Sequence, residues 1–390
     1  MVLPEQLEST GNPAGMATAV QGNTQFALDL YRAQRETPGN LIFSPYSISV
    51  ALAMTYAGAR GQTAAQMARA LHFDLEQQQL HPAFAALEAR LSEVGQQGAV
   101  QLRVANRLWP QQGCEFLEAY LALVKQFYAA PVTLVDYRNP EAARRTINAW
   151  VEEKTECKIV DLIPPGILDV LTRLVLTNAI YFKGSWASPF DKGLTRAAPF
   201  WVTPRTQVQA QMMAQKHGFG YAEFDGVQAL ELPYAGHDVS MIVLLPRERD
   251  GLAALEGALT AESLRRWTRD LWEREVEVFL PAFDVTFAIR LNDALKSLGM
   301  VDAFSDARAD FSGMDGSRSL YIAAVLHKAF VKVNEEGAEA AAATAVVLGR
   351  SAPLPPPLFR ADHPFLFLIR ENRTGSMLFL GRVVNPEQKT

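Results

Sequence analysis

The stretch GAEAAAATAVVLGRSAPLPPP, residues 337–357, combines small side chains, an Arg-Ser step and a run of prolines. Alanine favours helix, but Gly337 at one end and the prolines from Pro353 onward limit any helix here. As a strand, residues 338–347 would present one face with neither a charge nor a large side chain. That face consists of Ala338, Ala340, Ala342, Thr344 and Val346. The segment is therefore suited to a soluble loop and also to burial in a sheet.

A flexible alanine-rich linker is the alternative interpretation of this stretch. A linker needs neither the alternation of side chains nor an Arg350-Ser351 bond placed directly after it. The pattern therefore favours a loop that can become a strand.

The composition argues against several classes of protein. The chain has 390 residues, 49% of them hydrophobic, and a net charge of −5, which gives no support to binding of nucleic acid or an anionic membrane. No apolar run approaches the ~18 residues of a membrane helix. Cys114 and Cys157 are too few for a disulfide framework or a zinc site, and we expect two free thiols rather than one bridge.

Helix signals dominate the first third of the chain and strand signals the rest. Ser44 before Pro45 predicts an N-cap and the first residue of a helix that stops at Gly58, and Thr63 with Gln66 resembles a capping box. Further helices are predicted at 81–94, 114–129, 140–155, 250–272 and 289–299. Buried strands are predicted at 173–186, 228–246 (two strands), 275–283, 323–336 and 364–384 (a hairpin).

The domain organisation follows from the absence of any linker or internal repeat. Residues 23–390 are predicted to form one α+β domain, and residues 1–22 a disordered tail. This tail lacks the basic start and apolar centre of a signal peptide.

Catalytic and metal-binding motifs are missing from the sequence. It contains no G-x-S-x-G, H-E-x-x-H, Walker or G-x-G-x-x-G pattern, and its six histidines are scattered. We therefore expect no catalytic residue, no metal and no cofactor, and an enzyme is poorly supported.

Several separated segments, in a fixed order, resemble the serpin family. They are FSPYSISVALAMTYAGARGQTAAQMARALHF (43–73), TNAIYFKGSWASPF (177–190), LPAFDV (280–285), LHKAFVKVNEEG (326–337) and DHPFLFLIRE…LFLGRVVNP (362–386). The resemblance runs from about residue 23 to the C-terminus. It implies the serpin fold, with three β-sheets, surrounding helices and an exposed reactive-centre loop at about 337–357. It also implies a metastable suicide substrate that is cleaved, stays bound to the protease as a covalent acyl complex, and inserts its loop into the main sheet.

The resemblance assigns roles to individual residues. The hinge of the loop would comprise Glu335, Gly337, Ala338, Ala340, Ala342 and Thr344. The polar cluster where the sheet opens would comprise Ser44, Ser47, Asn178 and His327, with Trp186 at the top of the opening.

The reactive bond is predicted at Arg350-Ser351. An exposed arginine fits the pocket of a trypsin-like serine protease, and the string resembles the loop of thrombin-inhibiting serpins. Arg350 lies fifteen residues after Glu335, whereas the commonest family spacing of sixteen would make Ser351 the residue before the cleaved bond. We favour Arg350, because arginine offers the stronger recognition handle.

Other expectations concern partners and location. Heparin binding is not favoured, because the corresponding helix carries Arg90 as its only Lys or Arg, beside Glu88 and Glu93. The family implies a monomer and an extracellular or secreted location, while the missing signal peptide leaves the cytoplasm open. A non-inhibitory serpin, acting as a carrier, chaperone or storage protein, is the alternative function.

Overall fold

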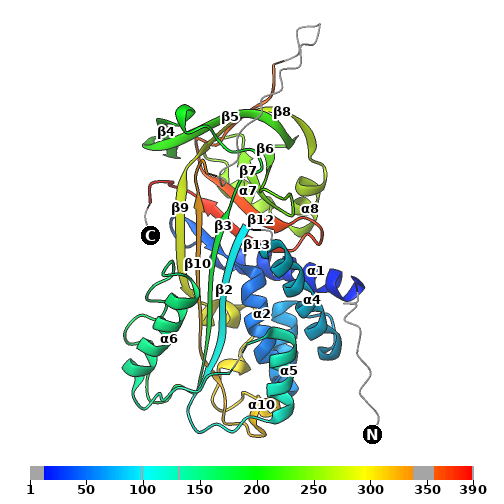
Figure 1. Cartoon of the computed structure of the whole chain (residues 1–390), viewed down its shortest axis with the longest axis vertical. Coiled ribbons are helices and arrows are strands. Elements are labelled where there is room, and N and C mark those ends of the chain that lie inside the picture. The colour runs from blue at the N-terminus through cyan, green and yellow to red at the C-terminus, as the bar shows by residue number, and fades with distance from the viewer. Residues whose placement is uncertain (1–12, 97, 99, 131, 337–354, 389–390) are drawn as a thin grey trace.

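A computed structural model describes the chain except residues 1–12, 97, 99, 131, 337–354 and 389–390 (Figure 1). The helices of the first part gather toward one end of the molecule, whereas strands make up the other end and also run along the length of the molecule. The early helices are α1 (Pro13–Gln34), α2 (Pro45–Tyr56), α3 (Gly61–Leu71), α4 (Gln77–Gln96), α5 (Glu118–Tyr128) and α6 (Pro140–Lys154).

The N-terminal prediction needs a correction. Helix α1 begins at Pro13, so residues 13–22 are helical and not part of a disordered tail. Ala19 and Val20 pack into the core, and this burial stabilises a segment whose own sequence is a weak helix signal.

The two predicted helix starts have different outcomes. The Ser44 hydroxyl accepts a hydrogen bond from the backbone N–H of Ser47, which confirms the N-cap of α2. The Thr63–Gln66 capping box is wrong, because α3 has already begun at Gly61. Thr63 accepts instead from the N–H of Asp310, and Gln66 from residues 301 and 302, so both side chains fasten α3 to a distant loop.

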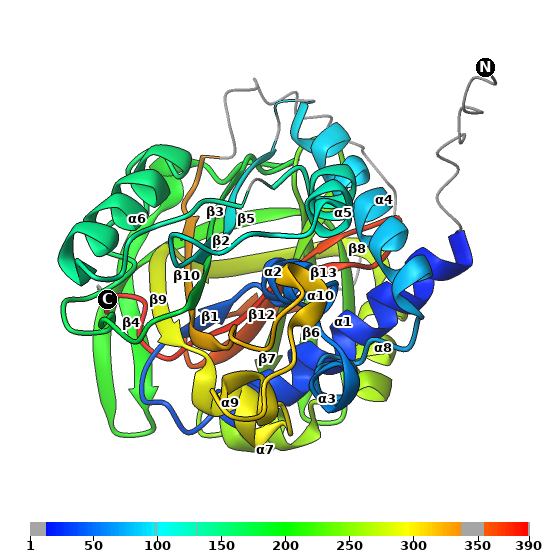
Figure 2. The same cartoon turned by 90° about the horizontal axis from the view of Figure 1, so that it is seen from below.

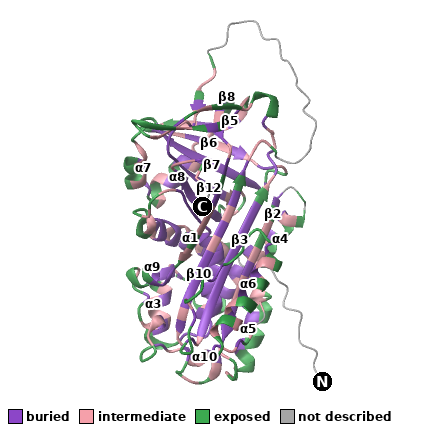
Figure 3. Cartoon of the chain, turned by 90° about the vertical axis from the view of Figure 1, so that its left-hand side faces the viewer, coloured by how far each residue is buried: buried purple, intermediate pink, exposed green. Residues whose placement is uncertain are grey.

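A four-stranded sheet forms the long face of the molecule, in the order β2 (Val100–Pro110), β3 (Leu174–Gly184), β10 (Ile322–Val333), β9 (Phe283–Arg290). Strands β3 and β10 were predicted, whereas β2 and β9 were not. Helix α6 covers one face of this sheet, where Ile147 and Val151 pack against Ala179 and Ala324 (Figure 2). The opposite face packs on the main core (Figure 3).

The other described strands form a nine-stranded sheet. Its members are β1 (Leu41–Phe43), β4 (Arg196–Thr203), β5 (Thr206–Phe224), β6 (Val227–Pro233), β7 (Val239–Pro246), β8 (Trp272–Pro281), β11 (Leu358–Arg360), β12 (Phe365–Glu371) and β13 (Met377–Val383). The family resemblance implies three sheets. The described strands join into two, because the 19-residue β5 pairs with β4 and β8 and then, near its end, with β6.

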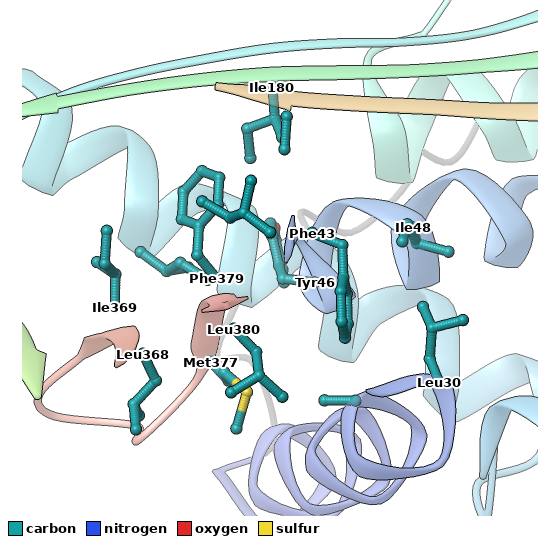
Figure 4. Packing of buried hydrophobic residues seen from close by; sticks show 14 of the residues in the cluster. Leu30, Phe43, Tyr46, Ile48, Ile180, Leu368, Ile369, Met377, Phe379 and Leu380 are labelled. Atoms are coloured by element: carbon teal, nitrogen blue, oxygen red, sulfur yellow. The ribbon is translucent and has the colours of Figure 1, made fainter. Parts of the chain in front are cut away.

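The remaining helical segments are short and peripheral. They are α7 (Leu252–Ala258), α8 (Ala261–Arg269), α9 (Asn292–Ser297), α10 (Ser312–Asp315) and the 3-10 turns at 192–194 and 302–304. The core lies between the two sheets and α2, where Ile180 of β3, Phe43 of β1 and Leu380 of β13 belong to one buried cluster (Figure 4). The α+β class predicted from the sequence is confirmed. Among the described residues, no helix is long and apolar enough to span a bilayer.

Candidate functional site at the β3–β10 seam

Strands β3 and β10 lie side by side at the centre of the four-stranded sheet and run parallel. Residues 174–182 of β3 pair with 322–331 of β10. The ladder ends at the pair Phe182–Val331, two residues before each strand ends. Beyond this point Gly184 pairs only with β2, and Val333 only with β9. The two central strands therefore part at one end, and we call their boundary the seam.

A row of polar side chains crosses the middle of the sheet. Asn106 of β2 stands opposite Asn178 of β3, and Asn178 stands opposite His327 of β10. The Asn178 amide donates to Ser47 Oγ at 2.6 Å and to Asn106 Oδ1, and its oxygen accepts from His327 Nδ1. The Ser47 hydroxyl donates to Asn106 Oδ1 at 3.2 Å. Three strands and α2 are thus joined by side-chain hydrogen bonds.

Residues at the N-terminus of α2 also take part in this network. The backbone N–H of Ser44 donates to His327 Nε2 at 3.2 Å, so this nitrogen is an acceptor and the ring proton lies on Nδ1. The Asn106 amide donates to the carbonyl of Ser47 at 3.2 Å. Ser44, Ser47, Asn178 and His327, which the family resemblance placed in one cluster, are brought together.

Burial decides the protonation of this network. Ser47, Asn178 and His327 have no exposed surface. Burial lowers the pKa of His327 to about 3, against a smaller opposing effect of its hydrogen bond with Asn178. The imidazole is therefore neutral at physiological pH, as its acceptor role toward Ser44 requires.

Trp186 lies beyond the end of the β3–β10 ladder. Its indole N–H donates to the carbonyl of Asn334 at 2.8 Å, directly after β10. Its ring stacks on Tyr234, with 4.5 Å between ring centroids. Gly184 makes room for this stack, since a Cβ at that position would lie 2.5 Å from the Tyr234 ring. Trp186 thus bridges the point where the strands part.

The first residues of the predicted hinge are tied to the segment after β3. The Thr195 hydroxyl donates to the Glu335 carboxylate at 2.7 Å, and Lys192 forms an ion pair with Glu336. The side chains of Lys192 and Glu336 are 64% and 58% exposed, so this ion pair is a surface contact. The chain is thereby held as far as Glu336.

The remaining loop predictions lie outside the described residues. These are Gly337, Ala338, Ala340, Ala342, Thr344, Arg350 and Ser351. The described chain resumes at Pro355, and the carbonyl of Pro357 accepts from the N–H of Glu277 at 3.0 Å before β11 pairs with β8. The segment 337–354 therefore connects the end of β10 to an edge strand of the other sheet.

Asn106 is the member of the polar row that the sequence interpretation missed. Its strand, VQLRVANRLWP, carries apolar residues at Val100, Leu102, Val104 and Leu108, with Asn106 at the one polar position of that series. This period-two pattern was a usable signal for a half-buried strand.

The structure also shows the state of the two cysteines and of Arg90. Cys114 and Cys157 are free thiols, as expected. Arg90 pairs with Asp238 and with Glu371, and its side chain is only 14% exposed. The cation on α4 is thus engaged within the molecule. The described residues contain no cluster of side chains that could hold a metal ion.

Comparison with known proteins identifies the family of this chain. The sequence model of "Serpin (serine protease inhibitor)" matches residues 21–386. The chain belongs to the serpin family. Human leukocyte elastase inhibitor is 44% identical to this serpin over 375 residues, which cover 93% of this chain and 98% of that protein. Human serpin B3 is 44% identical over 393 residues, covering 95% and 100%.

A solved structure agrees with this serpin in fold. Uncleaved ovalbumin superimposes with a TM-score of 0.86 at 31% identity, covering 95% of this chain and 100% of that one. The serpin fold predicted from the sequence motifs is thereby confirmed.

Proposed function

We propose that this serpin inhibits a serine protease as a suicide substrate and takes its own cleaved loop into the β3–β10 seam. The protease cleaves the loop, remains bound through an acyl bond, and is trapped when the freed loop inserts. The family membership and relatives named as protease inhibitors support this proposal. The observation that carries it is the parallel pairing of β3 with β10, which stops at the pair Phe182–Val331 before either strand ends. We call this the upper end of the seam.

The direction of the strands explains why that seam suits insertion. A loop that leaves the end of β10 at Glu336 and folds back would run antiparallel to β10, and therefore antiparallel to β3 as well. The inserted segment could then form antiparallel hydrogen-bond ladders on both sides, which are slightly more stable per residue than the parallel ladder they replace. The small residues of the 338–346 face would fit over the core without overpacking.

The proposed reactive bond is Arg350-Ser351, and the proposed target is a protease of trypsin-like specificity. An arginine at this position would pair with a buried aspartate in the protease pocket. The relatives named as elastase inhibitors favour a second candidate target, an elastase-like protease that cleaves beside a small residue. In that case the bond after Val347 or after Ser351 is the alternative.

Incubation with trypsin, and separately with elastase, tests mechanism and target together. A band on a denaturing gel with the combined mass of serpin and protease supports covalent trapping. Mass spectrometry of the released C-terminal peptide identifies the bond, because the peptide begins at Ser351 if Arg350 precedes the cut and at Ala352 if Ser351 does. Arg350→Ala should abolish the complex with trypsin, whereas the control Ser351→Ala should retain it.

The non-inhibitory alternative predicts a different gel. Complete conversion to cleaved serpin, with free active protease and no covalent band for either enzyme, would contradict the inhibitory mechanism. The absence of bulky, charged or proline residues on the inward face at 338–346 argues against that outcome.

A further inference from the structure

Strand β11 fixes the C-terminal end of the loop segment to the edge of the larger sheet. It pairs in parallel with β8, and the N–H of Ala361 extends this pairing by donating to the carbonyl of Phe279 at 2.9 Å. The carbonyl of Asp362 then accepts from the N–H of Trp201 on β4 at 2.7 Å. The chain is therefore bound to two strands before β12 begins.

His363 adds a third contact, to the end of β7. This residue is 6% exposed, its Nδ1 lies 2.8 Å from Oδ1 of Asp362, and its Nε2 lies 2.7 Å from the carbonyl oxygen of Pro246. An ionised carboxylate and a backbone carbonyl only accept hydrogen bonds, so both ring nitrogens must donate. The geometry therefore requires an imidazolium, in contrast to His327, whose Nε2 accepts from Ser44. We call the two contacts of His363 the His363 anchor.

The charges around the ring agree with this state. Among the described residues, Asp362 has the one carboxylate within 4.0 Å of the ring, and its side chain is 20% exposed, so solvent screens the pair only in part. The cations of the flanking segments contact other side chains: Arg247 with Glu223, Arg249 with Trp201 and Arg360 with Phe279. Asp362 is therefore the anion that balances the imidazolium.

The anchor bears on loop insertion because an uncleaved loop is fixed at both ends. If residues 338–347 entered the seam intact, they would extend along it by about 34 Å, at ~3.4 Å per residue. Residues 348–357 would have to return over the same length to reach β8, and ten fully extended residues span at most about 36 Å. Release of β11 would remove this limit. Contacts that hold β11 therefore oppose insertion before cleavage.

We propose that His363 is a positioning residue that keeps the uncleaved loop out of the seam by holding β11 on β8. With two protons, the ring makes two charge-assisted hydrogen bonds. When base removes one proton, one ring nitrogen faces an acceptor without a hydrogen, and the anchor weakens. Strand β11 then leaves β8 more often, and the uncleaved loop can enter the seam, where no protease reaches it. This inference rests on the proposed insertion into the seam.

Nitrogen-15 NMR of the imidazole tests the protonation without any protease. At pH 7 both ring nitrogens of His363 should carry a proton in the unmodified protein, and the loss of one signal in His363→Gln assigns the ring. Asp362→Asn should leave only one nitrogen protonated, because the amide does not balance the charge. A singly protonated His363 in the unmodified protein at pH 7 would overturn the proposal.

Amide hydrogen exchange at residues 358–361 measures how firmly β11 is held. Protection should fall about tenfold in His363→Gln, which loses a charge-assisted hydrogen bond. Asp362→Asn should show a loss of the same direction, and it keeps the test available if His363→Gln does not fold. The control His217→Gln removes an exposed histidine from β5 and should leave protection unchanged. Equal protection in the unmodified protein, His363→Gln and Asp362→Asn would contradict the anchor.

Prolonged incubation of uncleaved protein tests the consequence for inhibition. The capacity to form a covalent complex with trypsin should decline about tenfold faster in His363→Gln than in the unmodified protein, in line with the weaker anchor, and at the unmodified rate in His217→Gln. Equal rates of decline for the unmodified protein and His363→Gln would overturn the proposal. If freshly prepared unmodified protein formed no complex, the proposed function would be wrong, while NMR and hydrogen exchange would still decide whether the anchor exists.

Discussion

The middle of the β3–β10 seam and its upper end are held by different kinds of contact. In the middle, Ser47, Asn178 and His327 are fully buried and form a continuous network of hydrogen bonds. At the upper end, the indole hydrogen bond of Trp186, the partly buried Thr195–Glu335 hydrogen bond and the exposed Lys192–Glu336 pair connect the strands and the hinge. Breaking a buried polar network leaves unsatisfied groups, whereas an exposed ion pair exchanges its partner for water at little cost.

This difference gives the seam a direction of opening. If the seam opens, we expect its upper end to separate before the buried row in the middle. The β3–β10 ladder already ends below Trp186, which agrees with that order.

Acid should have the largest effect on the middle of the seam. The pKa of His327 is about 3 in the folded protein and ordinarily 6.5, so the unfolded chain binds the extra proton between these values. The stabilisation from neutral His327 is complete above pH 6.5 and declines as pH falls toward 3, by about 1.4 kcal/mol per pH unit. Protonated Nε2 would also oppose the N–H of Ser44.

Urea unfolding between pH 7 and pH 4 measures this effect. His327→Gln should reduce the pH slope of the unfolding free energy. His217→Gln, at an exposed position, serves as the control and should leave the slope unchanged. Identical slopes for the unmodified protein and His327→Gln would mean that His327 is not buried in the neutral form.

Asn178→Leu should destabilise the folded protein by about 3 kcal/mol at neutral pH, because Asn178 is the hub that links β2, β10 and α2. Gln101→Leu, an exposed polar-to-leucine change on the same sheet, should cost much less. Urea unfolding compares the two variants. Equal losses would show that the buried row contributes no more than the sheet surface.

Trp186→Phe sharpens the comparison at the upper end. Phenylalanine keeps an aromatic ring against Tyr234 but loses the hydrogen bond to Asn334, worth about 1 kcal/mol. Amide hydrogen exchange should accelerate at 333–336 and stay unchanged at 326–328. Trp201→Phe, in the other sheet, should change neither segment. Acceleration along the whole of β10 would contradict independent behaviour of the two ends.

Lys192→Gln should have the smallest effect. The Lys192–Glu336 pair is exposed and screened by salt, so we expect no measurable change in the melting midpoint. Lys216→Gln breaks a comparably exposed pair with Glu275 and provides the matched control. If Lys192→Gln lowered the melting midpoint as much as Asn178→Leu does, the two ends of the seam would not differ in how strongly they are held.

The sequence predicts the parts of this fold whose signals are local. The apolar run of β3, the C-terminal hairpin and the Ser44-Pro45 helix start depend on neighbouring residues, and each lies where expected. The polar cluster was assigned by family resemblance, since no local pattern indicates that Asn178 and His327 share a row.

The secondary-structure predictions that were wrong or absent concern segments whose structure depends on tertiary contacts. The Thr63–Gln66 pattern fits a capping box, but its side chains bind a loop more than 200 residues away. Residues 13–22 are helical because they pack on the core. Strand β5 bears glycines and a lysine that weaken its pattern, and pairing with β4, β6 and β8 specifies it instead.

Thermal melting of intact and loop-nicked protein tests most directly whether the seam accepts the loop. Cleavage between Val347 and Pro353 frees residues 338–347 to enter between β3 and β10, where they would gain ladder hydrogen bonds and buried contacts. The melting midpoint of the nicked protein should therefore rise. Nicked Ala338→Arg should rise less, since its first inward residue would bury an unpaired charge. An unchanged or lower midpoint after nicking would contradict insertion into the seam.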